Sequence, residues 1–149
     1  MAIYFLDTSA LVKLYVREQG TDRLLALTER SSGNRFAILG ISRVEFRSAV
    51  RRRERSGEIP AAIATQLLAA FERHVEGVFV TQAVTDYVLD QAMTLIDHYA
   101  LRAFDAVQLA GYIVLKNSAG SDIPVFVCSD HVLLSAAVQE GLSTFDPCV

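Results

Sequence analysis

Short apolar runs alternate with longer amphipathic segments along the whole 149-residue chain. The apolar runs are nearly continuous, which is typical of β-strands that are buried on both faces. The predicted strands are residues 3–6, 36–40, 77–81, 123–129 and a short one at 142–144. Helical spacing and capping residues predict helices over residues 8–16, 22–30, 42–55, 60–74, 84–98, 103–116 and 130–140.

Buried strands that alternate with helices predict an α/β fold in which a mostly parallel sheet is covered on both faces. No linker, repeat or low-complexity segment divides the chain, so we expect one domain over residues 1–149. In such sheets the functional crevice lies at the carboxyl ends of the strands. Asp7 and Asp130 each follow a predicted strand directly, so both acids are expected at this edge.

Composition limits the classes of protein to which the chain can belong. Hydrophobic residues make up 52% and the mean hydropathy is +0.30, which predicts a large core or an apolar surface covered by a partner. No apolar run approaches the roughly 20 residues of a membrane span, and Asp7 interrupts the only run that resembles a signal peptide. Cys128 and Cys148 have no metal or redox spacing, which favours a reducing cytoplasm.

The net charge of −3 argues mildly against a nucleic-acid partner when it is taken alone. The arginines are concentrated, however, in one predicted helix, which contains Arg43, Arg47, Arg51, Arg52, Arg53 and Arg55. A solvated helix face is the ordinary explanation of such a run. Because Arg47 and Arg51 share the helix of Glu45, they are also candidates for contacting a nucleic-acid backbone or the acidic side chains of a protein partner. The sequence leaves these alternatives open.

Four acids lie at a strand-to-helix junction or in the first turn of a predicted helix, namely Asp7, Glu45, Asp105 and Asp130. Each also has a purely structural interpretation. Asp7 and Asp130 are suitable helix N-caps, although Thr8 or Ser9 can already cap the first helix. The carboxylate of Asp7 is therefore redundant for capping, which favours a second role.

The two acids inside helices have structural alternatives as well. Ser42 and Glu45 have the spacing of a capping box, in which the glutamate reaches back to the first amide of the helix. Asp105 suits the positive end of its helix, and Arg102 is close enough in sequence to pair with it. Asp122 is a rival fourth acid, but it precedes its strand and is therefore expected at the opposite edge of the sheet.

The four acids are more informative together than singly. Clustered carboxylates repel one another and stay ionised together only around cations. Ligand sets made only of oxygen favour Mg²⁺ or Mn²⁺, and two such ions about 4 Å apart activate water and stabilise the leaving oxygen of a phosphodiester. His74, His98 and His131 lack zinc-like spacing and are not expected to bind the metal.

Four segments of the chain resemble a known family. They are YFLDTSALVKLY, ISRVEFRSAV, DYVLDQAMTLIDHYALRAFDAVQLAGYIVL and VFVCSDHVLLSAAVQEGL. Together, and in this order, they resemble the four acidic motifs of PIN-domain ribonucleases, and most of all the VapC-type toxins of type II toxin–antitoxin systems. The resemblance covers nearly the whole chain.

This resemblance implies a PIN-like three-layer α/β/α sandwich and an endoribonuclease that uses one or two Mg²⁺ ions, with Mn²⁺ possible. The residues matching the catalytic acidic quartet would be Asp7, Glu45, Asp105 and Asp130, and the firmest metal ligands among them Asp7 and Asp105. Ser9 would help to hold the metal or a phosphate. The resemblance further implies an RNA substrate, a cognate antitoxin whose C-terminal segment lies across the groove, and a homodimer.

Two features depart from the family pattern: Cys128 stands where threonine is usual, and a loop lengthens the stretch between Asp105 and Asp130. Other classes of protein fit less well. An aspartyl-nucleophile phosphatase would need a second acid at the position of Ser9, and a receiver-like domain would need a lysine after the last strand, whereas Lys116 precedes it. The main alternative is a non-catalytic PIN-fold module that binds RNA or protein.

Overall fold

The computed structural model describes residues 2–149 and contains a five-stranded sheet in which neighbouring strands are parallel. The strands are β1 (Ile3–Leu6), β2 (Arg35–Leu39), β3 (Val80–Gln82), β4 (Val125–Val127) and β5 (Thr144–Phe145), and their order across the sheet is β3-β2-β1-β4-β5. β1 is central, since Tyr4 pairs with Phe36 of β2 on one side and with Val125 of β4 on the other. The expected α/β fold with a parallel central sheet is confirmed.

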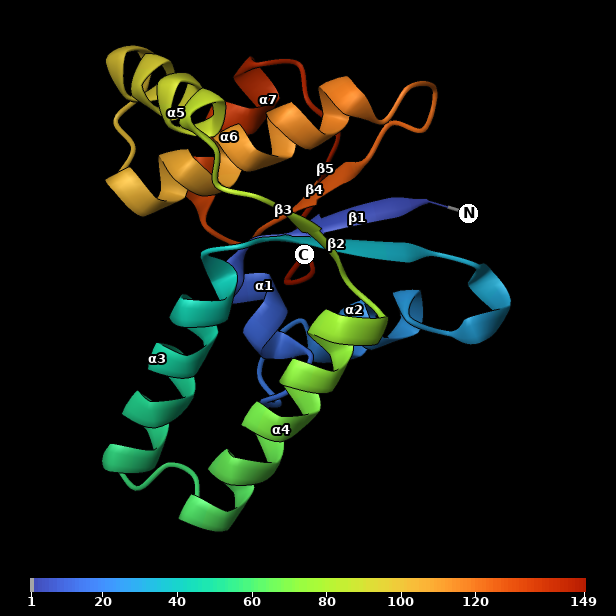
Figure 1. Ribbon diagram of the computed structural model, residues 1–149, viewed down its shortest axis with the longest axis vertical. Coiled ribbons are helices and arrows are strands. Elements are labelled where there is room, and N and C mark those ends of the chain that lie inside the picture. The colour runs from blue at the N-terminus through green and yellow to red at the C-terminus, as the bar shows by residue number, and fades with distance from the viewer. Residues whose placement is uncertain (1) are drawn as a thin grey trace.

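Helices cover both faces of this sheet (Figure 1). One face packs against α1 (Thr8–Lys13), α2 (Thr21–Leu27), α3 (Ser42–Arg55) and α4 (Ala61–Gly77), and the other against α5 (Asp86–His98), α6 (Ala103–Ser118) and α7 (His131–Gln139). A short 3-10 helix, η1 (Arg30–Ser32), precedes β2. The molecule is therefore a three-layer α/β/α sandwich. Within residues 2–149, no helix combines the length and the apolar character that crossing a membrane requires.

The sandwich has two hydrophobic cores, because successive side chains of a strand point to opposite faces. Phe5 of β1 packs on the side of α5–α7, together with Leu39 and Tyr112. Leu6, the next residue, packs on the side of α1–α4 together with Phe46. All five side chains are fully buried, and each such burial stabilises the fold by roughly 1.5–3 kcal/mol. The near-continuous apolar strands follow from this two-sided burial.

The order of the strands places a crevice beside the end of β1. The helices that connect β1 to β2 and β2 to β3 lie on one face, whereas those leading to β4 and β5 lie on the other. The strand order therefore reverses between β1 and β4, and a crevice forms outside the carboxyl ends of the strands at such a switch point. Asp7 follows β1 and its N–H donates to the Val127 carbonyl at the end of β4 (3.1 Å), so it lies at this point.

Several predicted boundaries on the α1–α4 side are wrong, including that of α2, which ends at Leu27 rather than at residue 30. α1 ends at Lys13 rather than near residue 16, because the Lys13 carbonyl accepts from the buried hydroxyl of Thr21 (2.8 Å) and leaves the helical ladder. The predicted strand at 77–81 begins too early, since α4 continues to Gly77 and β3 starts at Val80. The His74 carbonyl accepts from the N–H groups of both residues 78 and 79, which closes the helix before the strand.

The strands near the C-terminus also differ from the prediction. β4 spans Val125–Val127 instead of 123–129, because Pro124 has no N–H to donate and its carbonyl accepts from the Tyr112 hydroxyl instead. β5 lies at Thr144–Phe145, slightly later than the expected 142–144. β4 therefore ends two residues earlier than predicted, and Asp130 follows it after two intervening residues rather than directly.

Gly111 allows α6 to pack closely on β2, and its replacement tests that contact. A Cβ at Gly111 would lie 2.5 Å from Cδ1 of Leu39, a fully buried side chain. We expect Gly111→Ala to lower the free energy of unfolding by about 1–3 kcal/mol, the usual cost of overpacking a core. Urea denaturation monitored by circular dichroism measures this change.

Gly77→Ala is the matched control, because Gly77 is also helical and a Cβ there would meet nothing within 4 Å. We expect this variant to be as stable as the wild type or slightly more so, since alanine loses less backbone entropy on folding. Equal free energies of unfolding for the two variants would contradict a close contact at Gly111.

Candidate active site

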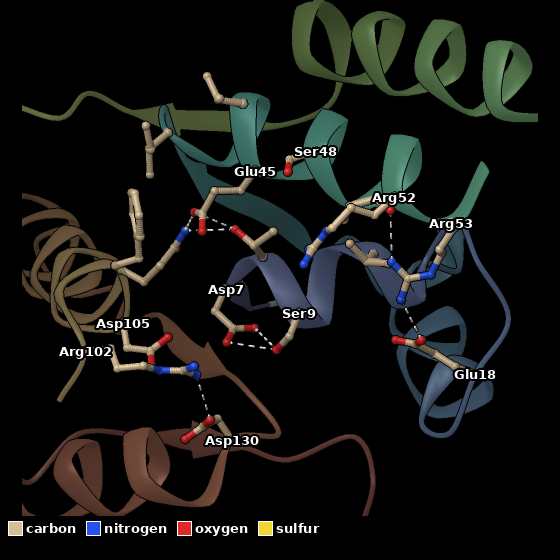
Figure 2. A pocket seen from close by; sticks show the side chains of 17 residues that line it. Asp7, Ser9, Glu18, Glu45, Ser48, Arg52, Arg53, Arg102, Asp105 and Asp130 are labelled. Carbon is tan, nitrogen blue, oxygen red and sulfur yellow. Dashed lines mark hydrogen bonds and ion pairs between the residues drawn. The ribbon is translucent and has the colours of Figure 1, made fainter. Parts of the chain in front are cut away.

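A pocket of about 700 Å³ lies at the carboxyl edge of the sheet (Figure 2). Side chains from the end of β1, from α1, α3 and α6 and from the segment after β4 line it, and they include all four predicted acids, Asp7, Glu45, Asp105 and Asp130. Asp122 lies in an exposed loop before β4 and is not among the lining residues. The fold thus brings together acids that are up to 123 positions apart and leaves the rival acid outside.

Asp7 combines a structural role with a place in the pocket. Its Oδ1 accepts from the N–H of Ala10 (2.8 Å), which makes Asp7 the N-cap of α1. The hydroxyl of Ser9 donates to Oδ1 and Oδ2 at 2.9 and 3.0 Å. The expectation that Thr8 or Ser9 caps this helix is therefore wrong, because both lie inside it and their hydroxyls are bound to carboxylates.

The Asp7 carboxyl is buried, with only 5% of the residue exposed. Burial raises the pKa of Asp7 to about 6, and the carboxylate of Asp105 adds to this increase. The N–H of Ala10, the thiol of Cys128 and the hydroxyl of Ser9 oppose the increase by donating to the charged form, without cancelling it. Ionised Asp7 is therefore costly at neutral pH, and a nearby cation would offset this cost.

Glu45 is held by side chains from two other helices. Its Oε1 accepts from the hydroxyl of Thr8 and from Nε2 of Gln108, both at 2.9 Å. The same nitrogen lies 2.9 Å from Oγ of Ser42 and 3.0 Å from Oγ1 of Thr8. The capping box is absent, because Ser42 is already the first helical residue and position 41 is the N-cap. Oε1 is thus fixed by two donors, whereas Oε2 has no hydrogen-bond partner among residues 2–149.

Asp105 and Asp130 share one cation in this structure. The Arg102 guanidinium lies 3.3 Å from Oδ2 of Asp105 and 3.9 Å from Oδ2 of Asp130, as Figure 2 shows. Asp130 also caps α7, since its Oδ1 accepts from the N–H of Leu133 (3.0 Å). The Arg102 side chain is 83% exposed, so these pairs are weak and the arginine can leave readily.

Comparisons with known proteins match this fold. The PIN-domain family model matches residues 4–112, which include Asp7, Glu45 and Asp105. Ribonuclease VapC47 from Mycobacterium tuberculosis (strain CDC 1551 / Oshkosh) is 31% identical over 145 residues, which cover 96% of each protein. The chain belongs to the PIN-domain family. The resemblance that its motifs suggested is thereby confirmed.

Solved structures share the PIN-like fold. PAE2754 from Pyrobaculum aerophilum has a TM-score of 0.63 and 23% identity, with 98% of this chain and 90% of that one covered. VapBC2 from Rickettsia felis, bound to a DNA fragment from their promoter, has a TM-score of 0.63 and 12% identity over 97% and 98% of the chains. FitAcB from Neisseria gonorrhoeae has a TM-score of 0.65 and 14% identity, with 97% of each chain covered.

The arginines of α3 are placed differently from the prediction. Arg47 is exposed and Arg51 pairs with Glu54 (2.8 Å), and neither lines the pocket, whereas Arg52 and Arg53 do. The reason is helical phase. Arg52 lies seven residues, almost two turns, after Glu45 and leaves α3 on the same side, while positions 47 and 51 point elsewhere.

The acids of the PIN-domain pocket suit a hard divalent cation, because they offer only oxygen atoms as metal ligands. Across residues 2–149, no three His, Cys, Asp or Glu side chains are already gathered into a metal-ligand cluster. The acids surround the pocket instead, and Arg102 provides the positive charge at Asp105 and Asp130. Burial raises the pKa of Asp7, so a cation beside it would stabilise the ionised carboxylate.

Sequence reasoning missed the part played by Gln108. The residue is 3% exposed in an otherwise apolar stretch of α6, and it links α1 and α3 through its Nε2. Its Oε1 is buried without a hydrogen-bond partner among the described residues. A lone polar residue one turn after Asp105 was the available signal, since burying an amide is costly unless it is hydrogen-bonded.

The raised pKa of Asp7 predicts a measurable pH dependence of stability. Its folded-state pKa of about 6 exceeds the ordinary value of 3.8, so between these values the folded protein keeps a proton that the unfolded chain releases. The free energy of unfolding that this group contributes therefore falls as pH rises through that window. Relative to that of Asp7→Asn, the free energy of unfolding of the wild type should fall by up to about 3 kcal/mol by neutral pH.

Asparagine is a suitable replacement because it caps helices as well as aspartate and cannot ionise. Urea denaturation of both proteins at pH 4 and pH 7.5, in the presence of EDTA, measures the difference. We expect similar stabilities at pH 4 and a more stable variant at pH 7.5. A difference that is the same at both pH values would show that the Asp7 pKa is not raised.

Proposed function

We propose that this PIN-domain protein is a Mg²⁺-dependent endoribonuclease toxin that hydrolyses phosphodiester bonds of RNA, with Mn²⁺ as an alternative ion. The observation that carries the proposal is the convergence of Asp7, Glu45, Asp105 and Asp130 in one pocket at the switch point of the sheet. The 31% identity to a protein named as a ribonuclease supports the same reaction class.

The pocket residues would have separate roles in binding metal and in positioning the ligands. Asp7 and Asp105 would hold one or two divalent ions, with Glu45 and Asp130 contributing directly or through water. When bound, such an ion lowers the pKa of the attacking water and offsets charge on the phosphate. Ser9 orients the Asp7 carboxylate through its two contacts, and the free Oε2 of Glu45 is positioned by the two donors on Oε1.

Arg102 would change partners as the site fills. Its guanidinium contacts the two carboxylates that a metal ion would also bind. Because the Arg102 side chain is exposed, its replacement by a metal ion would cost little free energy. A released Arg102 stands at the mouth of the pocket, where a positive charge would favour the approach of a phosphate.

We further propose that a cognate antitoxin restrains the activity, that the protein forms a homodimer and that it acts in the cytoplasm. The VapC-type relative and the VapBC2 neighbour support the antitoxin partner. The homodimer has support from α5, whose outward face exposes Leu89, Met93 and Ile96 by 41, 57 and 42%. These residues are spaced four and three apart, so they form one apolar stripe suited to a protein surface.

The first experiment compares purified wild type, Asp7→Asn and Asp122→Asn on total RNA with Mg²⁺, Mn²⁺ or EDTA. Asp122→Asn is the matched control, because it removes the same charge from an exposed loop outside the pocket. We expect discrete fragments from wild type and Asp122→Asn with metal, a loss of at least about 100-fold for Asp7→Asn, and no cleavage in EDTA.

Cleavage by all three proteins would indicate a contaminating nuclease or a role for Asp7 in capping alone. An inactive wild type that still binds RNA or a protein partner would favour the non-catalytic PIN-fold module. The preparation must be free of any co-purifying partner, because an antitoxin across the pocket would give the same negative result.

Gln108 provides a prediction about how Glu45 is positioned. Gln108→Met keeps the side-chain volume but removes the amide donors, so it should release Oε1 of Glu45. We expect cleavage to fall roughly 10-fold, and we expect little further loss when Gln108→Met is added to Glu45→Gln. A double-mutant cycle on the cleavage rate measures this coupling. Fully additive losses, with unchanged melting temperatures, would contradict a role exerted through Glu45.

A further inference from the structure

The pocket has a second end with the opposite charge. Beyond the four acids it extends along α3 and the segment after α1, where Ser48, Arg52, Arg53 and Glu18 line it (Figure 2). Ser48 and Arg52 follow Glu45 at helical spacings of three and seven residues, so one side of α3 forms a continuous wall from the acidic to the basic end.

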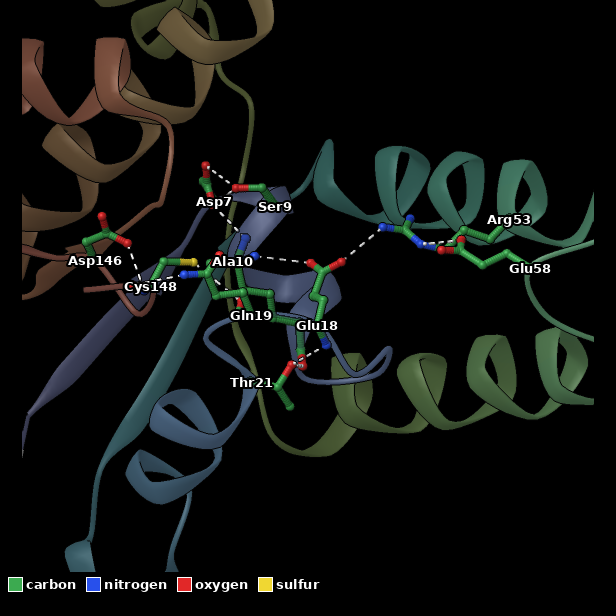
Figure 3. Close-up of polar contacts among 11 residues, drawn as sticks. Asp7, Ser9, Ala10, Glu18, Gln19, Thr21, Arg53, Glu58, Asp146 and Cys148 are labelled. Atoms are coloured by element: carbon green, nitrogen blue, oxygen red, sulfur yellow. Dashed lines mark hydrogen bonds and ion pairs between the residues drawn. The ribbon is translucent and has the colours of Figure 1, made fainter. Parts of the chain in front are cut away.

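Most cations at this end are already neutralised. Arg53 lies 3.3 Å from both Glu18 and Glu58, and Glu18 also pairs with Lys13 (3.2 Å). Figure 3 shows Glu18 and Glu58 on either side of the Arg53 guanidinium. Elsewhere on the helix, Arg43 pairs with Glu72 and Arg51 with Glu54. Arg53 links the end of α3 to neighbouring segments, Arg43 links its start to α4, and Arg51 pairs within α3, so each of these arginines already has a carboxylate partner.

Arg52 differs from all of them. It is exposed, it lines the pocket, and its guanidinium takes part in no hydrogen bond or ion pair with residues 2–149. In Figure 2 its side chain extends from α3 into the pocket above Ser9. With Lys13 and Arg53 balanced by Glu18 and Glu58, the remaining positive charge of this end is that of Arg52.

The distance between the two ends determines what kind of ligand can use both. Seven helical residues separate the backbones of Glu45 and Arg52 by about 10 Å, which exceeds the width of one phosphate group. A ligand that contacts both a cation held by the carboxylates and the Arg52 guanidinium therefore carries anionic groups at more than one position. A nucleic-acid strand does so, with one phosphate per nucleotide.

We propose that Arg52 is a phosphate-binding residue for a single-stranded RNA whose backbone leaves the carboxylate cluster along α3. It contacts a phosphate one or two nucleotides from the bond that is cut. This inference rests on the proposed nuclease function and adds the path of the strand to it. It also replaces Arg47 and Arg51, which the sequence suggested for this role, by Arg52.

The test uses the full chain with Asp7→Asn, so that RNA is bound without being cut. Binding of a fluorescent 12-nucleotide single-stranded RNA is measured from 50 to 300 mM salt for this parent and for the parent with Arg52→Gln or Arg47→Gln. Arg47→Gln is the matched control, because it removes the same charge from an exposed position of the same helix that does not line the pocket.

We expect Arg52→Gln to weaken binding roughly fivefold at 50 mM salt and to reduce the slope of log K against log salt by about 0.7, the value for one phosphate contact on a single strand. Arg47→Gln should change affinity by less than twofold. Arg52→Lys should restore the slope, because it restores the charge. The loss caused by Arg52→Gln should also increase with length from a dinucleotide to the 12-mer.

Equal losses for Arg52→Gln and Arg47→Gln, or no loss for either, would overturn the assignment while leaving the nuclease proposal intact. The same holds if Arg52→Gln leaves RNA binding unchanged and weakens only the binding of an acidic peptide. A parent that binds no RNA, together with a wild type that cleaves none, would overturn both proposals. Circular dichroism of each variant establishes that the comparison is between folded proteins.

Discussion

The burial of one carboxylate at the end of the central strand is the constraint on which the rest of this site depends. Asp7 is 5% exposed, and removing an acid from water favours its neutral form. The fold supplies donors to it from Ala10 and Ser9, yet its pKa is still raised to about 6. The ionised carboxylate therefore lowers the free energy of unfolding when no cation lies beside it. Such a loss of stability is common where a site is organised for a ligand.

The position of Asp7 follows from the order of the strands. β1 is flanked by β2 and β4, so the helices that follow all three strands can reach the end of β1. Gln108 of α6, the helix that precedes β4, links two of these helices, because its Nε2 lies within hydrogen-bonding distance of Thr8 on α1 and of Ser42 and Glu45 on α3. The orientation of the Glu45 carboxylate therefore depends on the packing of three helices, and a small shift of α6 would change it.

The sequence predicted the features that depend on local pattern. Two-sided burial makes the strands apolar throughout, and a parallel sheet brings their carboxyl ends to one edge, so the acids could be placed near each other before any coordinates were known. The boundary between α4 and β3 was predicted wrongly, because an apolar run such as GVFV is compatible with the end of a helix as well as with a strand.

Features that depend on tertiary partners were beyond the sequence pattern. Ser42 and Glu45 have the spacing of a capping box, but Glu45 has two donors that lie 37 and 63 positions away in sequence. An arginine of α3 reaches the pocket only if it lies on the same side of the helix as Glu45. The helical spacing therefore selects an arginine only once Glu45 is known to line the pocket. Counting seven residues from a correctly placed acid would have identified Arg52.

The distribution of charge also determines the order in which ligands can enter. The net charge of −3 suggests a poor partner for nucleic acid, but the pocket concentrates four carboxylates at one end, and at the other end Arg52 has no ion-pair partner among residues 2–149. A phosphate that approached the acidic end alone would meet like charge in a partly buried site, where screening is weak. A polyanion can therefore occupy the whole pocket only after cations have neutralised the carboxylates. Under the proposed function, metal concentration would then control RNA affinity as well as catalysis.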